Sequence, residues 1–228
     1  MASTLDPLTL LSVTQLADSA FPSGGFAFSQ GLESLVAEKR ITGEADLRAL
    51  LEQQLHDRWL VFDRYFVTAA HRDFQSPDRL AAHDQEVECM TPAEGLREGS
   101  KRNGMALLTS HEKIGTAQAA QYRHMVMDSQ ALGHLPVVQG LVLHARDLDL
   151  DASLAVAVHG FLAGQVSAAV RLSVIGTLAA QRILGSLHKD LASALARPLP
   201  EDAPWSFTPL VEIAAMRHET RSLRLFTN

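Results

Sequence analysis

The sequence has a single cysteine, Cys89, so no disulfide can form within its 228 residues. A lone thiol fits a reducing cytoplasm, and its simplest role is that of a small buried hydrophobic group. Aromatic residues make up only 6%, whereas alanine and leucine are abundant, and this composition favours close helix–helix packing over a sheet. A formal net charge of −6 disfavours nonspecific binding to nucleic acid or to anionic membranes.

The motifs of common catalytic and nucleotide-binding sites are also missing. No G-x-x-x-x-G-K-[ST] run occurs, which argues against a phosphate-binding loop. Ser29 lies near glycines, but Ala27 breaks the G-x-S-x-G pattern of a nucleophile elbow. The ten histidines are scattered and none lies near Cys89, so no local metal-ligand spacing is present. The sequence therefore predicts no catalytic residues, no metal ligands and no cofactor, although distant ligands can still converge in space.

Two segments bear on targeting and on membranes. Residues 1–7 lack the basic start and the apolar run of a signal peptide. Residues 152–170 are mostly Ala, Val and Leu, but polar residues interrupt them and the apolar side chains are small. A helix that is apolar all round belongs in a core or an interface, so we expect a buried helix rather than a membrane span.

Helix signals recur along the chain, and strand signals are few. Asp6 followed by Pro7 is typical of a helix start, and residues 21–26 then interrupt the pattern as a loop. Residues 91–94, Thr-Pro-Ala-Glu, have the pattern of a capping box at the start of another helix. A short helix is expected near Ser29, and longer ones near 115–129, 136–146, 151–170 and 174–196. The strongest three-and-four spacing predicts one amphipathic helix through Leu47, Leu51, Leu55, Trp59, Phe62 and Phe66.

The sequence changes in character after Arg197, where four prolines occur within twelve residues. Proline removes a backbone donor and fixes φ, so this part is expected to be irregular and laid over the surface. We therefore predict an all-α, single-domain helical bundle. Residues 1–197 form its helical part, and residues 198–228 form an irregular proline-rich C-terminal segment and tail of the same domain. These features alone identify no function.

Three separated segments resemble the UreF family of urease accessory proteins. Residues 16–33 contain Phe-Pro-Ser-Gly-Gly-Phe followed by Ser-Gln-Gly-Leu-Glu, which is similar to the N-terminal pattern of the family. Residues 168–182 resemble its Ala-Val-[Lys/Arg]-Leu, Gly and Gln pattern, and residues 209–226 resemble its C-terminal signature. The segments occur in family order and at family spacing. Three positions depart from the pattern: Phe28 replaces the usual Tyr or Trp, Arg171 a frequent Lys, and Glu212 an Asp or small residue.

The resemblance implies a non-catalytic, homodimeric protein that helps to deliver nickel to urease in the cytoplasm. Its implied partners are the accessory protein UreH (also called UreD), the nickel-binding GTPase UreG, and apo-urease, where nickel is inserted at a carbamylated lysine. The implied roles are to recruit UreG, to modulate its GTP hydrolysis and to form part of a nickel passage. Small residues such as Ala155, Ala163 and Ala169 allow close helix approach in a dimer, and a central core helix would use them equally.

The resemblance and the residues together give candidate partner-binding positions: Phe21, Pro22, Gly24, Gly25, Phe26, Phe28, Arg171, Arg217, His218, Glu219, Arg221, Arg224 and Phe226. Gly24 and Gly25 permit a turn with positive φ, position a partner surface, or do both. Such a loop would expose the rings of Phe26 and Phe28 as apolar anchors for a partner. Arg171 is either a structural arginine or a contact to the GTPase.

The C-terminal tail, residues 209–228, is expected to be a partner-dependent recognition element rather than a core helix. The prolines separate it from the preceding helix, and Arg217, Arg221 and Arg224 would share one face if the tail is helical. Arginine forks suit carboxylates on a partner. The resemblance implies that UreH orders this tail, which then receives UreG.

Two other classes of protein stay open on the sequence. A helical enzyme with a site assembled from distant residues predicts a deep pocket with several converging titratable groups. A soluble carrier that holds nickel itself predicts histidines that converge in space.

Overall fold

The computed structural model describes residues 6–25 and 28–218. Helices account for 72% of the chain and these residues contain no strand, which confirms the all-α single domain. The elements, in chain order, are α1 (Pro7–Ala17), α2 (Leu32–Ala37), α3 (Glu44–Gln54), the π-helix η2 (Leu55–Asp63), α4 (Arg64–Arg72), α5 (Pro77–Met90), α6 (Glu94–Lys113), α7 (Ala117–Met127), α8 (Leu135–His144), α9 (Leu150–Arg171), α10 (Thr177–Leu195) and α11 (Pro209–His218).

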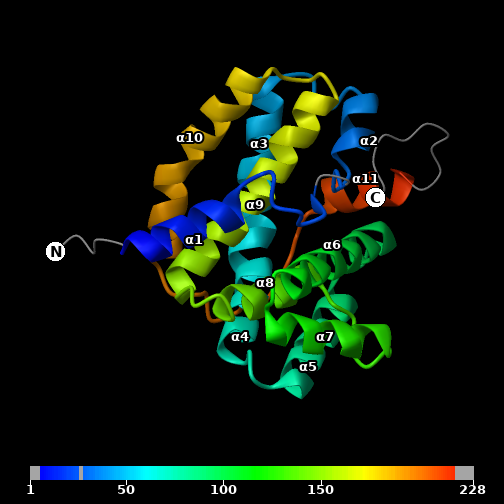
Figure 1. Cartoon of the computed structure of the whole chain (residues 1–228). Coiled ribbons are helices and arrows are strands. Elements are labelled where there is room, and N and C mark those ends of the chain that lie inside the picture. The colour runs from blue at the N-terminus through cyan, green and yellow to red at the C-terminus, as the bar shows by residue number, and fades with distance from the viewer. Residues whose placement is uncertain (1–5, 26–27, 219–228) are drawn as a thin grey trace.

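Two groups of helices share the core (Figure 1). α3, α9 and α10 form the upper group, with α1 lying across α9. The lower group consists of α4, α5, α6, α7 and α8, with the tightest packing between α4 and α8 and between α6 and α8. The continuous run of α3, η2 and α4 belongs to both groups and ties them together.

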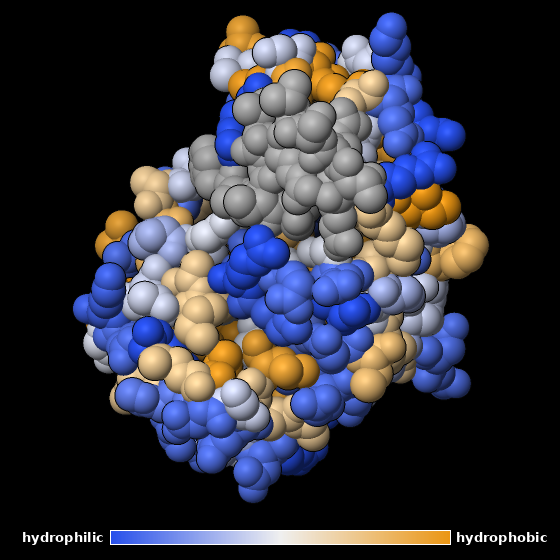
Figure 2. All heavy atoms as spheres, turned by 90° about the vertical axis from the view of Figure 1, so that its right-hand side faces the viewer, coloured by the Kyte–Doolittle hydropathy of each residue, from blue (hydrophilic) through white to orange (hydrophobic). Residues whose placement is uncertain are grey.

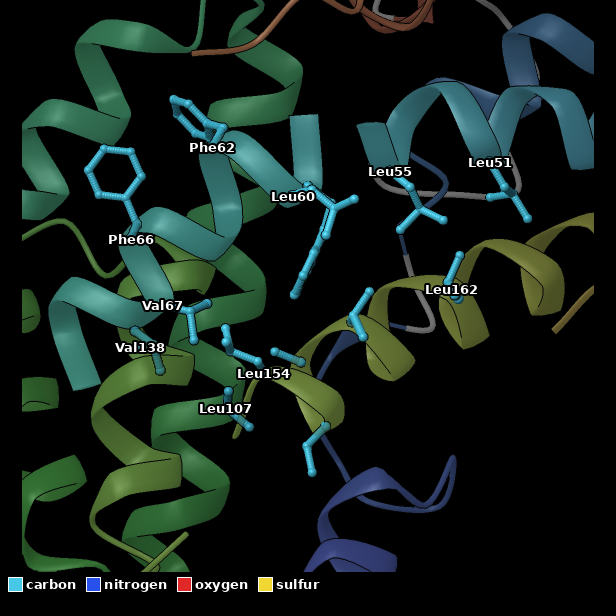
Figure 3. Packing of buried hydrophobic residues seen from close by; sticks show 14 of the residues in the cluster. Leu51, Leu55, Leu60, Phe62, Phe66, Val67, Leu107, Val138, Leu154 and Leu162 are labelled. Carbon is cyan, nitrogen blue, oxygen red and sulfur yellow. The ribbon is translucent and has the colours of Figure 1, made fainter. Parts of the chain in front are cut away.

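This continuous run carries the predicted apolar pattern, and all six of its positions are buried. Figure 3 shows Leu51 and Leu55 lying over Leu162 of α9, while Phe62 and Phe66 lie on the part of the run nearer α8. Trp59 to Phe62 are consecutive and all buried, so this part of the π-helical segment is enclosed on every side, whereas His56 near its start is exposed. A three-and-four spacing cannot indicate such a segment, because that spacing marks a helix with one exposed face.

The long apolar helix α9 is the central core helix. Its length and composition would suffice to cross a membrane, yet more than half of its most apolar window is buried inside the protein. This agrees with the predicted buried helix. Of the small residues considered for a dimer interface, Ala169 is fully buried within the chain and Ala163 is half-buried, whereas Ala155 is exposed. The close approach at Ala169 therefore serves the core of one chain.

Two glycines mark the closest crossings in the lower group. A Cβ atom added at Gly140 of α8 would lie 2.4 Å from the carbonyl oxygen of Val67 in α4. One added at Gly104 of α6 would lie 1.9 Å from the carbonyl oxygen of Gly133, in the turn before α8. Real Cβ atoms do not approach backbone this closely, so only glycine lets these elements meet at the observed distance.

One buried carboxylate fixes the turn that leads into α8. Asp84 of α5 is fully buried and accepts hydrogen bonds from the backbone amides of Leu132 (3.0 Å), Gly133 (2.6 Å) and His134 (2.8 Å). The Tyr122 hydroxyl donates a fourth hydrogen bond at 2.7 Å, and burial together with the nearby carboxylate raises the pKa of that phenol. A carboxylate with four donors is well satisfied, so Asp84 is a structural clamp.

The sequence signals for helix starts were correct for α1 and wrong for α6. The Asp6 carboxylate accepts from the amides of Leu8 and Thr9 and so caps α1 as predicted. The capping box was wrong, because α6 begins after Ala93 and the buried Thr91 hydroxyl has no partner among the described atoms. Cys89 was also placed wrongly: it is exposed on α5 rather than buried.

The proline-rich segment between α10 and α11 crosses the surface of η2. The backbone amide of Phe207 donates to the carbonyl of Asp57 at 2.9 Å. Arg64 at the start of α4 reaches the end of α10, where its guanidinium donates to the carbonyls of Leu195 (3.0 Å) and Arg197 (2.6 Å). These contacts satisfy carbonyls at the end of α10 and hold the segment against the body of the protein.

Candidate functional site

The loop between α1 and α2 carries most of the N-terminal candidate residues, and its path depends on glycine. Gly24 has φ +80°, and a Cβ atom there would lie 2.6 Å from the Cβ atom of Ala106 in α6. Gly25 has no such constraint, since an added Cβ atom would meet only Ser23 Oγ, at 3.8 Å. Gly24 is therefore required by both conformation and space, and Gly25 is open to another role.

The aromatic residues of this loop turn inward in the described part of the chain. Phe21 is half-buried and its ring lies 5.3 Å from that of His111 in α6. Phe28 is buried, and its ring occupies the space beside Gly99, so the expectation that the loop exposes Phe28 was wrong. An aromatic hydroxyl or indole at this position would enter the same enclosed space. Phe26 lies outside the described residues.

α6 holds the loop in place through hydrogen bonding and burial. The Ser110 hydroxyl donates to the carbonyl of Pro22 at 2.6 Å. The neighbouring His111 is almost fully buried, and burial, reinforced by the charge of Arg146, lowers its pKa to about 4. His111 is therefore neutral at physiological pH and packs as an aromatic group beneath Phe21.

A cavity of about 200 Å³ lies beneath the loop, between η2, α6, α8 and α9. Its wall on the α9 side includes the small residues Gly160, Ala163 and Gly164. Two buried glutamines also line it, and neither the Gln54 amide nitrogen nor the Gln165 amide oxygen has a hydrogen-bond partner in the described structure. A polar donor and acceptor left unpaired in a cavity are groups that water or a polar ligand satisfies.

The N-terminal loop meets the C-terminal helix. Gly31, at φ +82°, packs so closely on α11 that an added Cβ atom would lie 2.9 Å from the carbonyl oxygen of Val211. Val211, Ala214 and Ala215 are buried, so α11 is a core helix and the expectation that residues 209–228 lie outside the core was wrong for this part. Arg217 lies near the end of α11, with its Nη1 atom 3.4 Å from the Glu38 carboxylate. The segments that resemble the two ends of the family pattern thus lie against each other.

Some of the other candidate residues lie in the described part of the chain, and the rest lie outside it. Arg171 is exposed at the end of α9, which approaches α2. His218 is the last residue of α11. Glu219, Arg221, Arg224 and Phe226 lie outside the described residues. The loop, α2, α11 and the end of α9 therefore form one region of the molecule, which we call the terminal face (Figure 1).

Figure 2 views the molecule from the side on which α11 lies, and the described surface there is mainly hydrophilic, with small hydrophobic patches. Within the described ranges, no group of three or more His, Cys, Asp or Glu residues converges as a metal site would require. Sequence reasoning missed the cavity and its two glutamines, because they come from segments more than one hundred residues apart.

An all-helical fold whose N-terminal loop packs against its C-terminal helix beside a cavity defines a class of helical protein in which segments from both halves of the sequence share one face. The particular family follows from comparison with known proteins: the chain belongs to the UreF family, whose model matches residues 41–188. It is therefore an accessory protein of urease maturation.

Full-length relatives support this assignment. The urease accessory protein UreF of Trichodesmium erythraeum (strain IMS101) is 30% identical over 226 residues, covering 96% of this chain and 96% of the relative. The protein of the same name from Arthrobacter sp. (strain FB24) is 31% identical over 223 residues, 95% of this chain and 96% of the relative. That of Actinobacillus pleuropneumoniae is 29% identical over 220 residues, 94% and 97% respectively.

Proposed function

We propose that this chain is a non-catalytic helical scaffold that binds UreH (UreD) and the GTPase UreG in the cytoplasm and brings them to apo-urease. In this complex it recruits UreG, modulates its GTP hydrolysis and supports nickel insertion. Family membership over nearly the whole chain, together with the packing of the N-terminal loop on α11 at the terminal face, is the observation that carries the proposal.

The terminal face is suited to sequential partner binding. Its inner layer is closely packed, because Gly24 meets the side chain of Ala106 and Gly31 meets the backbone of α11. Its outer layer contains the exposed Arg171 and Arg217. A closely packed base that carries exposed arginines pre-organises a surface for acidic groups on a partner, and this limits the entropic cost of binding.

The cavity supports a role in a nickel passage. It is bounded by the loop on one side and by α9 on the other, and its unpaired Gln54 and Gln165 amides favour water over hydrocarbon inside it. A hydrated metal ion moves through space that offers water and neutral polar groups more readily than through a dry apolar core. Binding of a partner at the loop would then extend the cavity toward that partner.

The experiment is a truncation after Met216, which retains the buried part of α11 and removes residues 217–228. Tagged UreH and UreG are co-expressed with the full-length or truncated chain, and complex recovery, urease activation in cells and the melting temperature are measured on matched samples. We expect a melting temperature close to that of the full chain with reduced capture of UreH, UreG or both. A truncated chain that keeps its stability, captures both partners and activates urease would overturn the proposal.

Arg171→Ala and Arg171→Lys form a matched pair for the effect on GTP hydrolysis. If the charge of Arg171 contacts UreG, the alanine variant should lower the GTP turnover of the complex at least severalfold, and the lysine variant should retain most of it, since lysine is frequent at this family position. If Arg171 is structural, both variants will leave turnover unchanged.

A further inference from the structure

Two histidines that lie far apart in the sequence meet at the C-terminal ends of two helices. His71 is near the end of α4 and His144 is the last residue of α8. Their Nδ1 atoms are 3.2 Å apart, and both side chains are half-buried, so the pair is in contact with solvent. This pair lies outside the terminal face and outside the residues that line the cavity.

The hydrogen bonding of His71 determines which of its nitrogens is free. Its Nε2 atom lies 2.9 Å from the carbonyl oxygen of Leu148, and a carbonyl can only accept, so Nε2 carries the proton. The Nδ1 atom of the neutral ring therefore presents a lone pair toward His144. An imidazole that donates one N–H to a backbone carbonyl while its other nitrogen stays free has the arrangement found in metal-ligating histidines.

The second imidazole is held in position by packing. The ring of Phe74 stacks on His144 with centroids 3.6 Å apart and planes inclined by 24°. Burial and the proximity of His71 lower the pKa of His144. Hydrogen bonding thus orients the first imidazole and stacking orients the second, and an oriented imidazole is a common metal ligand.

The spacing of the two rings matches that of a shared metal ion. Their centroids are 4.4 Å apart with planes inclined by 69°, and a hydrogen-bond distance of 3.2 Å separates the Nδ1 atoms in the metal-free chain. Two nitrogens bound at about 2.0–2.1 Å to one ion lie about 2.9 Å apart at a right angle and about 3.4 Å apart at the tetrahedral angle. The observed separation falls between these two geometries.

The local field also favours a cation. The C-terminal ends of α4 and α8 converge here, and a helix C-terminus carries partial negative charge. The carboxylate of Asp147 acts on His144 in the same sense, as it opposes the lowering of the pKa of that ring. No third histidine, cysteine or carboxylate completes the cluster within the described residues, so water would fill the remaining coordination positions.

We propose that the Nδ1 atoms of His71 and His144 form a two-imidazole site for a divalent transition-metal ion such as Ni²⁺ or Zn²⁺. In the absence of metal, the His144 Nδ1–H group donates a hydrogen bond to His71 Nδ1, so neither lone pair is available to an ion. On binding, His144 moves its proton to Nε2, and both lone pairs point to the ion. Hard cations such as Mg²⁺ prefer oxygen ligands and are not bound.

The site is tested by calorimetric titration of the isolated full-length chain with Ni²⁺, and with Mg²⁺ as a cation that should not bind. His71→Ala and His144→Ala should each weaken one nickel equivalent by at least about tenfold, the scale of loss seen even when a supporting partner of a metal-bound histidine is removed. In the double variant the same single nickel equivalent should be affected and no second one, because both ligands serve one ion. His124→Ala, which removes an exposed histidine on α7, is the matched control and should bind as the wild type does.

A second measurement needs no substitution. In the unmodified chain, Zn²⁺ should shift the Nδ1 resonances of two histidine rings together, and Mg²⁺ should not. Nickel stoichiometry and affinity that are unchanged in both variants, or Zn²⁺ that leaves every pair of Nδ1 resonances in place, would overturn the inference. Because the isolated chain is used, this outcome is independent of whether UreH and UreG are captured.

Discussion

At the scale of single residues, His111 links the stability of the loop contact to pH. Its pKa in the folded chain is about 4, whereas an unfolded histidine titrates near about 6.5. The unfolded chain therefore binds the proton first as the pH falls. The contribution of neutral His111 to the free energy of unfolding is therefore complete above pH 6.5 and is lost between pH 6.5 and pH 4.

The variant His111→Gln removes this titration and keeps a polar side chain in the same position. Between pH 7 and pH 5 the wild type should lose roughly 2 kcal/mol more of its free energy of unfolding than the variant, as measured by urea denaturation at each pH. Carboxylates that titrate in this range contribute equally to both chains. Parallel loss in the two proteins would show that His111 takes up its proton without unfolding.

Two glycines in helices should respond to alanine in opposite directions. At Gly104 the new Cβ atom would lie 1.9 Å from the carbonyl oxygen of Gly133, so Gly104→Ala should cost about 1–3 kcal/mol or more. At Gly185 of α10 nothing lies within 4 Å, so alanine should stabilise the helix by about 0.5–1 kcal/mol. Urea denaturation of the two variants tests the pair, and equal effects would contradict the close crossing at Gly104.

Residue identity alone predicted some of these roles and not others. Asp6 was predicted as a cap because the cap and the helix are adjacent in sequence. Asp84 could not be predicted as a clamp, since its backbone donors lie nearly fifty residues away. Cys89 was assigned to the core from the usual preference of the residue type, and only packing shows that its position on α5 faces solvent.

At the scale of secondary-structure elements, α11 combines a buried half with an exposed end. Removing residues 209–228 takes Val211, Ala214 and Ala215 out of the core, whereas removing 217–228 leaves them in place. Burial of one valine alone is worth about 1.5–3 kcal/mol, so we expect the longer deletion to lower the free energy of unfolding by at least about 2 kcal/mol. Calorimetric melting of both truncated chains against the full chain measures the difference, and equal melting temperatures would place α11 outside the core.

The spacing of apolar residues predicted that most of the helices exist, but not how they pack against one another. The apolar spacing from Leu47 to Phe66 identified a buried helical run correctly. It could not reveal the π-helix within that run, because enclosure from every side depends on neighbours distant in sequence. The prolines before α11 suggested a detached tail, yet the small residues of α11 allow it to pack on Gly31, and this contact outweighs the break in the chain.

At the scale of the whole molecule, α1 presents leucines to solvent. Leu8 is 74% exposed and Leu11 is 68% exposed, although α1 lies across the core helix α9. Neighbouring apolar side chains of this size on a surface mark an association site. We propose that the chain forms the homodimer that the family resemblance implies, with α1 as part of the surface between its two chains.

Light scattering at micromolar concentration should therefore show a dimer of the isolated chain. The double variant Leu8→Ser/Leu11→Ser should shift it toward monomer, because burial of each leucine contributes about 1.5–3 kcal/mol to association. Leu178→Ser removes a leucine that is 76% exposed on α10 and is the matched control. A monomeric wild type, with and without UreH, would count against the homodimer.

The contact between Gly31 and α11 has a consequence for protein synthesis. Gly31 leaves the ribosome early, but the helix that it packs against is made roughly 180 residues later, at about 5–20 residues per second. The loop must therefore wait on the order of 10–40 s for its neighbour. The terminal face can form only after α11 has been translated. A partner that recognises this face would bind chains that include α11 and ignore shorter ones.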